Sequence, residues 1–262
     1  MNVGMAAAGS IGGVMKSRMW VALCLLQFAA WTCSIGVLQA QDKPKRLTIW
    51  DIHIGDAASD IPDEFAAYAC GTNGGPPSTP LASFAEFKKC RPDANGLREV
   101  YFEYDDELEY WARALDLKAE IRMYSGTTVY EYPIVASVLF DEAGRVRGER
   151  MVTDPRRHAA RQRSEFWTLG NFLRQRFGEA DWDCRDLPRD EGERPAGSLF
   201  VKNHCEKIAD GLHLILEERY FQKKGQQFLD PHTGQPEPEP YESATRFEMY
   251  DAAAPLRSTS AD

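Results

Sequence analysis

Two cysteines, Cys70 and Cys90, bracket the stretch that most restricts how this chain can fold. The loop at residues 71–80 is rich in Gly and Pro, which favour a defined, irregular backbone. Thr79 and Pro80 then read as an N-cap and a first helical residue. A Cys70–Cys90 disulfide would close a loop of about 20 residues and stabilise the fold by roughly 3 kcal/mol. The stretch is either a rigid binding loop or a stapled connection between two elements.

The N-terminal 40 residues have the pattern of a secretory signal. Their only charged residues are Lys16 and Arg18, and an uncharged run from Met19 to Ala40 follows. A basic segment, an apolar segment and a small final residue predict a signal peptide over 1–40, cleaved after Ala40. The same run is also long enough for an uncleaved membrane anchor.

The net charge of the chain argues against some classes of binding partner. The formal charge of the 262-residue chain is −9, and removing residues 1–40, with two basic and no acidic residues, lowers it to −11. Such a chain is repelled by nucleic acid and by anionic membrane surfaces. We therefore expect neither nucleic-acid binding nor a stable membrane span after cleavage.

Four cysteines remain after residue 40, and an even number in an exported chain predicts two disulfides. Three connectivities are open, and we expect the sequential one, Cys70–Cys90 and Cys184–Cys205, because each pair closes a local loop. Since none of the four forms a Cys-x-x-Cys pair, neither a thioredoxin-like site nor a zinc knuckle is supported. The expected location is periplasmic or secreted.

Hydrophobic periodicity divides the rest of the chain into helices and strands. The expected strands are 47–54, as a strand or extended entry, 97–104, 133–140, 145–152, 198–208, 212–221 and 241–250. Helices are expected at 62–69 and at 164–177, the last ending at Gly178, and 107–115 is expected as a helix with a bent second strand as the alternative. Each half thus places a helix before antiparallel strands. This order predicts an α+β fold with two disulfide-stapled helix-plus-antiparallel-sheet halves, 41–157 and 158–251, and a disordered tail at 252–262.

Several short features resemble a known group of bacterial proteins. They are Ile52–Gly55 before a short helix, the strand–turn–strand Leu139–Val146, Leu173–Gly178, and Trp182. These features resemble the modules of β-lactamase-inhibitory-protein-like and outer-membrane assembly lipoprotein domains. The resemblance implies a secreted binding or envelope-assembly protein without catalysis, and it transfers no functional residue.

The densest acidic cluster runs from Glu103 to Glu109. Carboxylates this close together can hold Ca²⁺ or raise one another's pKa for acid–base chemistry. They leave open a carboxylate-dependent hydrolase or lyase, or a Ca²⁺-stabilised structural module. The five histidines show no metal-ligand spacing and no Gly-x-Ser-x-Gly is present, so we expect no cofactor, no metal site and no assigned catalytic residue.

The leading hypothesis is a non-catalytic exported protein that binds an envelope protein or a small ligand. The expected surface combines the 71–80 loop with the aromatic and acidic segment that follows residue 100, because Tyr and Trp are favoured at binding surfaces. Its candidate ligand-binding residues are Thr72, Asn73, Tyr101, Tyr104, Asp105, Asp106, Glu107 and Trp111.

Overall fold

A computed structural model describes residues 46–104, 115–116, 127–130, 132–154, 166–225, 228–229, 236–237 and 242–253. The chain separates into two units, residues 1–45 and 46–262, and every described residue belongs to the second. The expected signal peptide lies outside the described residues. Within them, no helix is both long and apolar enough to cross a membrane.

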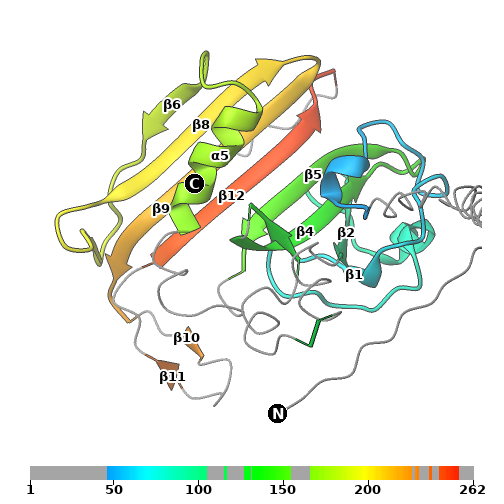
Figure 1. Ribbon diagram of the computed structural model, residues 1–262, viewed down its shortest axis with the longest axis horizontal. Helices are drawn as coiled ribbons and strands as arrows, with labels where there is room; N and C mark the ends of the chain where they lie inside the picture. Colours follow the sequence, from blue (N-terminus) through cyan, green and yellow to red (C-terminus); the bar gives the residue numbers. More distant parts are fainter. Residues whose placement is uncertain are drawn as a thin grey trace, which may run out of the picture. The chain divides into compact units, whose positions relative to one another are not determined.

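One antiparallel sheet organises the described chain (Figure 1). Its neighbouring strands follow the order β1-β2-β4-β5-β12-β9-β8-β6, with β3 paired to β4 and β7 to β9. The strands are β1 (Ala66–Cys70), β2 (Arg98–Glu103), β3 (Thr128–Val129), β4 (Tyr132–Phe140), β5 (Val146–Thr153), β6 (Asp183–Asp186), β7 (Glu193–Arg194), β8 (Val201–Ala209), β9 (Leu212–Lys223) and β12 (Glu242–Asp251). A separate pair joins β10 (Phe228–Leu229) to β11 (Pro236–Glu237).

The expected α+β class is wrong, because the described chain is mostly antiparallel β-sheet. Its helices are the 3₁₀ helices η1 (Ile49–Asp51), η2 (Phe84–Lys89) and η4 (Phe166–Thr168), and one α-helix, α5 (Leu169–Arg176). The two expected helix-plus-sheet halves do not form separate sheets, since β5 pairs with β12 along Gly148–Val152. The expected strands from 97 onward are present and pair into one sheet, whereas the strand expected at 47–54 is wrong, because the 3₁₀ helix η1 forms there.

The helix expected at 62–69 is replaced by strand β1. Its backbone pairs with β2, from Ala66 opposite Glu103 to Cys70 opposite Val100. On its other side, Tyr68 O accepts a hydrogen bond from Leu81 N, and Cys70 N donates to Thr79 O. These partners come from distant parts of the chain, and they outweigh a local preference for helix. The helix expected at 107–115 lies almost entirely outside the described residues.

The helix expected near the middle of the chain is confirmed in part as α5, which ends just before Gly178. In Figure 1 it lies across β9 and β12. Its buried Leu169 and Leu173 join the main hydrophobic core, together with Phe84 of η2 and Ile49 of η1. The core therefore lies between one face of the sheet and the helices.

Both expected disulfides are confirmed. Cys70–Cys90 spans the Gly- and Pro-rich loop and η2, whereas Cys184–Cys205 joins β6 to β8 at directly opposite positions. Two disulfides are typical of proteins outside the reducing cytoplasm. The first fixes the loop beside β1, and the second fixes the strand at one edge of the sheet.

Candidate functional site

The candidate site lies on the sheet face opposite the core. In β12, Phe247 and Met249 belong to the core, so the alternate side chains point to the other side. We call this side the polar face. It carries charged and polar side chains from β2, β5 and β12, namely Glu99, Arg150, Arg246, Glu248 and Tyr250.

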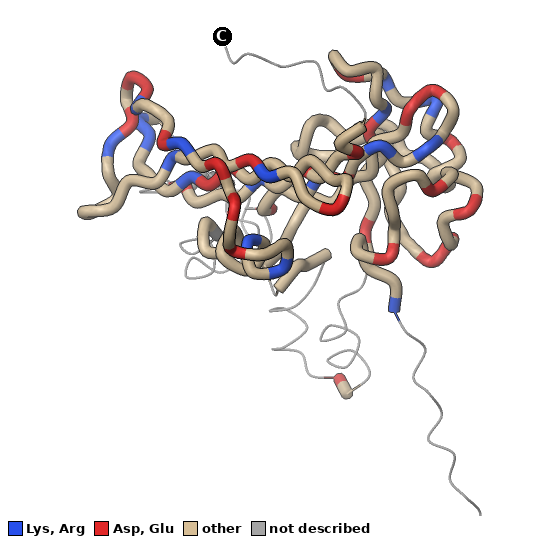
Figure 2. Tube along the Cα trace, turned by 90° about the horizontal axis from the view of Figure 1, so that it is seen from above, with Lys and Arg blue, Asp and Glu red and all other residues tan. Residues whose placement is uncertain are grey.

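A groove of about 820 Å³ runs over the polar face. Its floor is built from β5, β12, β9, β8 and β6, and the loop segments at Asn73 and 93–95 contribute at one end. The strand register aligns one row of neighbours across it: Val152, Arg246, Glu217, His204 and Arg185. Side chains from five strands therefore meet in one groove. Figure 2 shows basic and acidic residues interspersed along the strands rather than gathered by sign.

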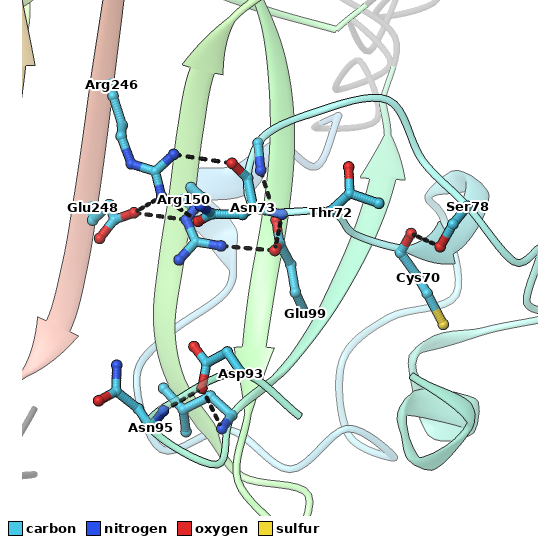
Figure 3. Close-up of polar contacts among 12 residues, drawn as sticks. Cys70, Thr72, Asn73, Ser78, Asp93, Asn95, Glu99, Arg150, Arg246 and Glu248 are labelled. Carbon is cyan, nitrogen blue, oxygen red and sulfur yellow. Dashed lines mark hydrogen bonds and ion pairs between the residues drawn. The ribbon is translucent and has the colours of Figure 1, made fainter. Parts of the chain in front are cut away.

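Arg150 is the centre of a buried ion-pair network (Figure 3). Its Nη1 donates to Glu99 Oε2 and its Nε to Glu248 Oε1, each at 2.7 Å. Tyr250 donates its hydroxyl proton to the second oxygen of Glu248 at 2.7 Å. Because Arg150, Glu99 and Glu248 are only 5%, 7% and 8% exposed, these bonds are shielded from water.

The network fixes the charge states of its members. Burial raises the pKa of Glu248, but the positive charges of Arg150 and Arg246 outweigh it and hold the pKa below its ordinary value. Burial likewise lowers the pKa of Arg150, and the charges of Glu248 and Glu99 outweigh it to give a raised pKa. Arg150 and Glu248 are therefore ionised at neutral pH, and their charges position neighbours rather than exchange protons.

The loop inside the first disulfide is bound to this network. Asn73 N and Gly74 N donate to the two carboxylate oxygens of Glu99 at 2.6 and 3.2 Å. Arg246 donates to the backbone and side-chain oxygens of Asn73. A Cβ on Gly71 would lie 2.3 Å from the Glu99 side chain, so the close approach requires glycine. The loop consequently borders the groove as part of a defined structure.

The structure separates the residues expected to form the binding surface. Asn73 contacts the network, and Thr72 lies beside it with its hydroxyl donating to Pro76 O at 2.7 Å. Tyr101 is buried with Ala69 and Val135, whereas Tyr104 is buried in the main core. The remaining candidates, Asp105, Asp106, Glu107 and Trp111, lie outside the described residues. The described tyrosines thus do not share an exposed surface with the loop.

The residues that sequence reasoning missed are the charged members of the network. In β12 the signal is a charged residue at alternate positions between apolar ones, whereas β5 carries Glu149 and Arg150 side by side and lacks this alternation. Arg246 and Glu248 alternate with Phe247 and Met249, and Arg150 precedes the buried Met151. A strand that is apolar on one side and charged on the other predicts a polar sheet face, although it does not say which charges pair.

No family model, curated protein or solved structure matches this chain. Among the described residues, no group of three or more His, Cys, Asp or Glu side chains is arranged to hold a metal ion. The side chains that line the groove are charged, polar and apolar. These offer hydrogen bonds and charges of both signs, held in place by ion pairs before any ligand arrives.

Proposed function

We propose that this chain is an exported, non-catalytic binding protein whose protein or small-molecule ligand lies in the groove on the polar face. The observation that carries the proposal is the combination of an 820 Å³ groove with a rigid charged floor. That volume falls within the range of known ligand sites, about 300–1,000 Å³. Fixed side chains lose little freedom on binding, which favours affinity.

The periplasm or the extracellular space is the proposed location. The two disulfides and the signal-like pattern over 1–40 support it. An envelope-binding role also agrees with what the resemblance to secreted inhibitory and assembly modules implies. The ion-paired state of Arg150 and Glu248 supports binding rather than catalysis, because their polar atoms already have partners.

Site-directed photo-crosslinking in an exporting bacterium tests the groove directly. A crosslinking amino acid replaces Ala94, which is exposed and lines the groove, or Glu179, which is exposed in the loop after α5. We expect a discrete crosslinked product from position 94 that is missing from position 179. Equal products from both positions, or none from position 94, would contradict the proposal.

A further inference from the structure

The groove has the length of an extended polypeptide segment. Its floor crosses five neighbouring strands, β5, β12, β9, β8 and β6. At about 4.8 Å between strands, the four gaps span about 19 Å. An extended chain rises about 3.3 Å per residue, so about six residues would cross the floor. The shape therefore fits a peptide lying across the strands.

The arginines on β5 and β12 differ from those on β9 and β6 in how they are paired. Toward β5, Arg150 is bound by Glu99 and Glu248, and Arg246 pairs with Glu248. Toward β6, Arg185 is exposed and makes no ion pair with the described residues. Arg219, on β9, is 45% exposed, and among the described residues its only carboxylate contacts are long, at 3.5 and 3.6 Å. Positive charge is thus left available on β9 and β6.

One of those two carboxylates, that of Glu217, also contacts His204 on the neighbouring strand β8. His204 Nδ1 lies 3.3 Å from Glu217 Oε1, and its Nε2 lies 2.9 Å from Glu206 Oε1. His204 is itself opposite Arg185 in the strand register. Glu217 is therefore held on the His204 side of the groove, and it neutralises Arg219 only in part.

The second disulfide holds Arg185 in place. Cys184, the preceding residue, is bonded to Cys205 on β8. Two residues after Arg185, Leu187 N donates to Lys202 O at 2.7 Å. The backbone on both sides of Arg185 is therefore tied to β8, so little backbone freedom would be lost when a ligand binds there.

From these observations, and resting on the proposed function, we infer that the part of the groove between β9 and β6 binds a carboxylate of an extended polypeptide ligand through Arg219 and Arg185. Guanidinium groups match carboxylates in a bidentate geometry and give strong, charge-assisted hydrogen bonds. The chain's net charge of −9 repels strongly acidic ligands at a distance. The preferred segment therefore carries one carboxylate among uncharged residues.

A display library of random six-residue peptides, selected on the immobilised full chain, tests this inference. We expect enrichment of Asp or Glu at one position. The enrichment should disappear on Arg185→Ala and Arg219→Ala and persist on Arg91→Ala, an exposed arginine outside the groove. Peptides enriched equally with and without the two arginines, or without an acidic position, would overturn the inference.

Fluorescence polarisation with one selected peptide sharpens the result. Replacing its acidic residue by the amide should weaken binding about tenfold or more, as expected for a lost charge-assisted hydrogen bond. The same peptide change should have little further effect on Arg185→Ala. Additive losses would place the carboxylate elsewhere and overturn the assignment. Unchanged circular dichroism and melting temperature confirm that each variant is folded.

The selection also separates this inference from the proposed function. Ala244→Trp fills the groove floor on β12, opposite Arg219 on β9. If the selected peptides bind the native chain but not Ala244→Trp, and show no acidic preference, the groove remains the proposed binding site and the carboxylate inference is wrong. If the peptides bind the native chain and Ala244→Trp equally well, the groove is not the binding site, and the inference fails with the proposed function.

Discussion

At the scale of single residues, two neighbours in β5 meet opposite conditions. Arg150 points to the polar face, where carboxylates on β2 and β12 pair with it. Glu149 points into the core, where it is fully buried and neither carboxylate oxygen has a hydrogen-bond partner among the described residues. The surroundings of Arg150 favour its charged form, whereas burial favours the uncharged form of Glu149.

Glu149 makes the stability of the protein depend on pH. Burial raises its pKa well above 4.5, although the charge of Arg176 opposes the shift. Below about pH 4.5 the carboxyl is protonated in both states. As the pH rises, the unfolded chain ionises first, so the free energy of unfolding falls until the folded pKa is passed.

We expect Glu149→Gln to remove this dependence. Urea unfolding is measured at several pH values between about 4.5 and 8. The free energy of unfolding of the unmodified protein should fall relative to that of Glu149→Gln by up to about 1.4 kcal/mol per pH unit. Comparing the two proteins cancels the other titrating groups. Parallel pH profiles would show that Glu149 ionises alike in both states.

Arg150→Met tests the buried network. The variant leaves Glu99 and Glu248 facing each other without their shared cation, so we expect a loss of about 3–5 kcal/mol in chemical denaturation. Adding Glu99→Gln and Glu248→Gln to the same chain should recover part of it. As a control, Lys89→Ala breaks an exposed pair with Glu86 and should cost less than about 1 kcal/mol. A similar small loss for Arg150→Met would contradict a stabilising network.

At the scale of elements, the loop after β1 connects the first disulfide to the polar face. Its contacts reach Glu99 on β2 and Arg246 on β12. Cys70–Cys90 fixes the two ends of segment 70–90, and the carboxylate of Glu99 fixes the part at Asn73 and Gly74. The loop is therefore an ordered border of the groove.

Gly71→Ala should displace this border. The added methyl group would overlap the Glu99 side chain, so we expect a loss of about 1–3 kcal/mol in thermal or urea unfolding. Amide exchange at Asn73 and Gly74 should also become faster. Thr72→Ala is the matched control, because it removes only an exposed hydrogen bond to Pro76. Equal effects from the two variants would show that the loop is not packed on Glu99.

Several elements could be predicted from the sequence, and the reasons differ. Alternating strands and cysteine spacing are local signals, so β4, β5, β8, β9 and both disulfides were predicted. Residues 62–69 were predicted as a helix because Asp60 and Pro62 have the pattern of a helix start, and the strand β1 that forms there contains a bulge between Ala66 and Ala69. The candidate site was predicted only at its loop, through Asn73. Its network joins Arg150 to residues 51 and 98 positions away, and that pairing depends on the strand order.

At the scale of the whole described chain, the sheet continues from β5 to β12, so both expected halves contribute to one groove. The first supplies the loop, Glu99 and Arg150, and the second supplies Glu248, the partner of Arg150, with His204, Arg185 and Arg219. The function proposed for the groove therefore requires both halves together.

Native mass spectrometry of the protein released from the cell envelope without reductant tests the central claim most directly. We predict a chain beginning near Gln41, lighter than the reduced chain by the hydrogens lost in forming two disulfides, together with a heavier species that carries the bound ligand. That species should be missing from Ala244→Trp. A bare chain alone, or the same heavier species in both proteins, would contradict a ligand in the groove.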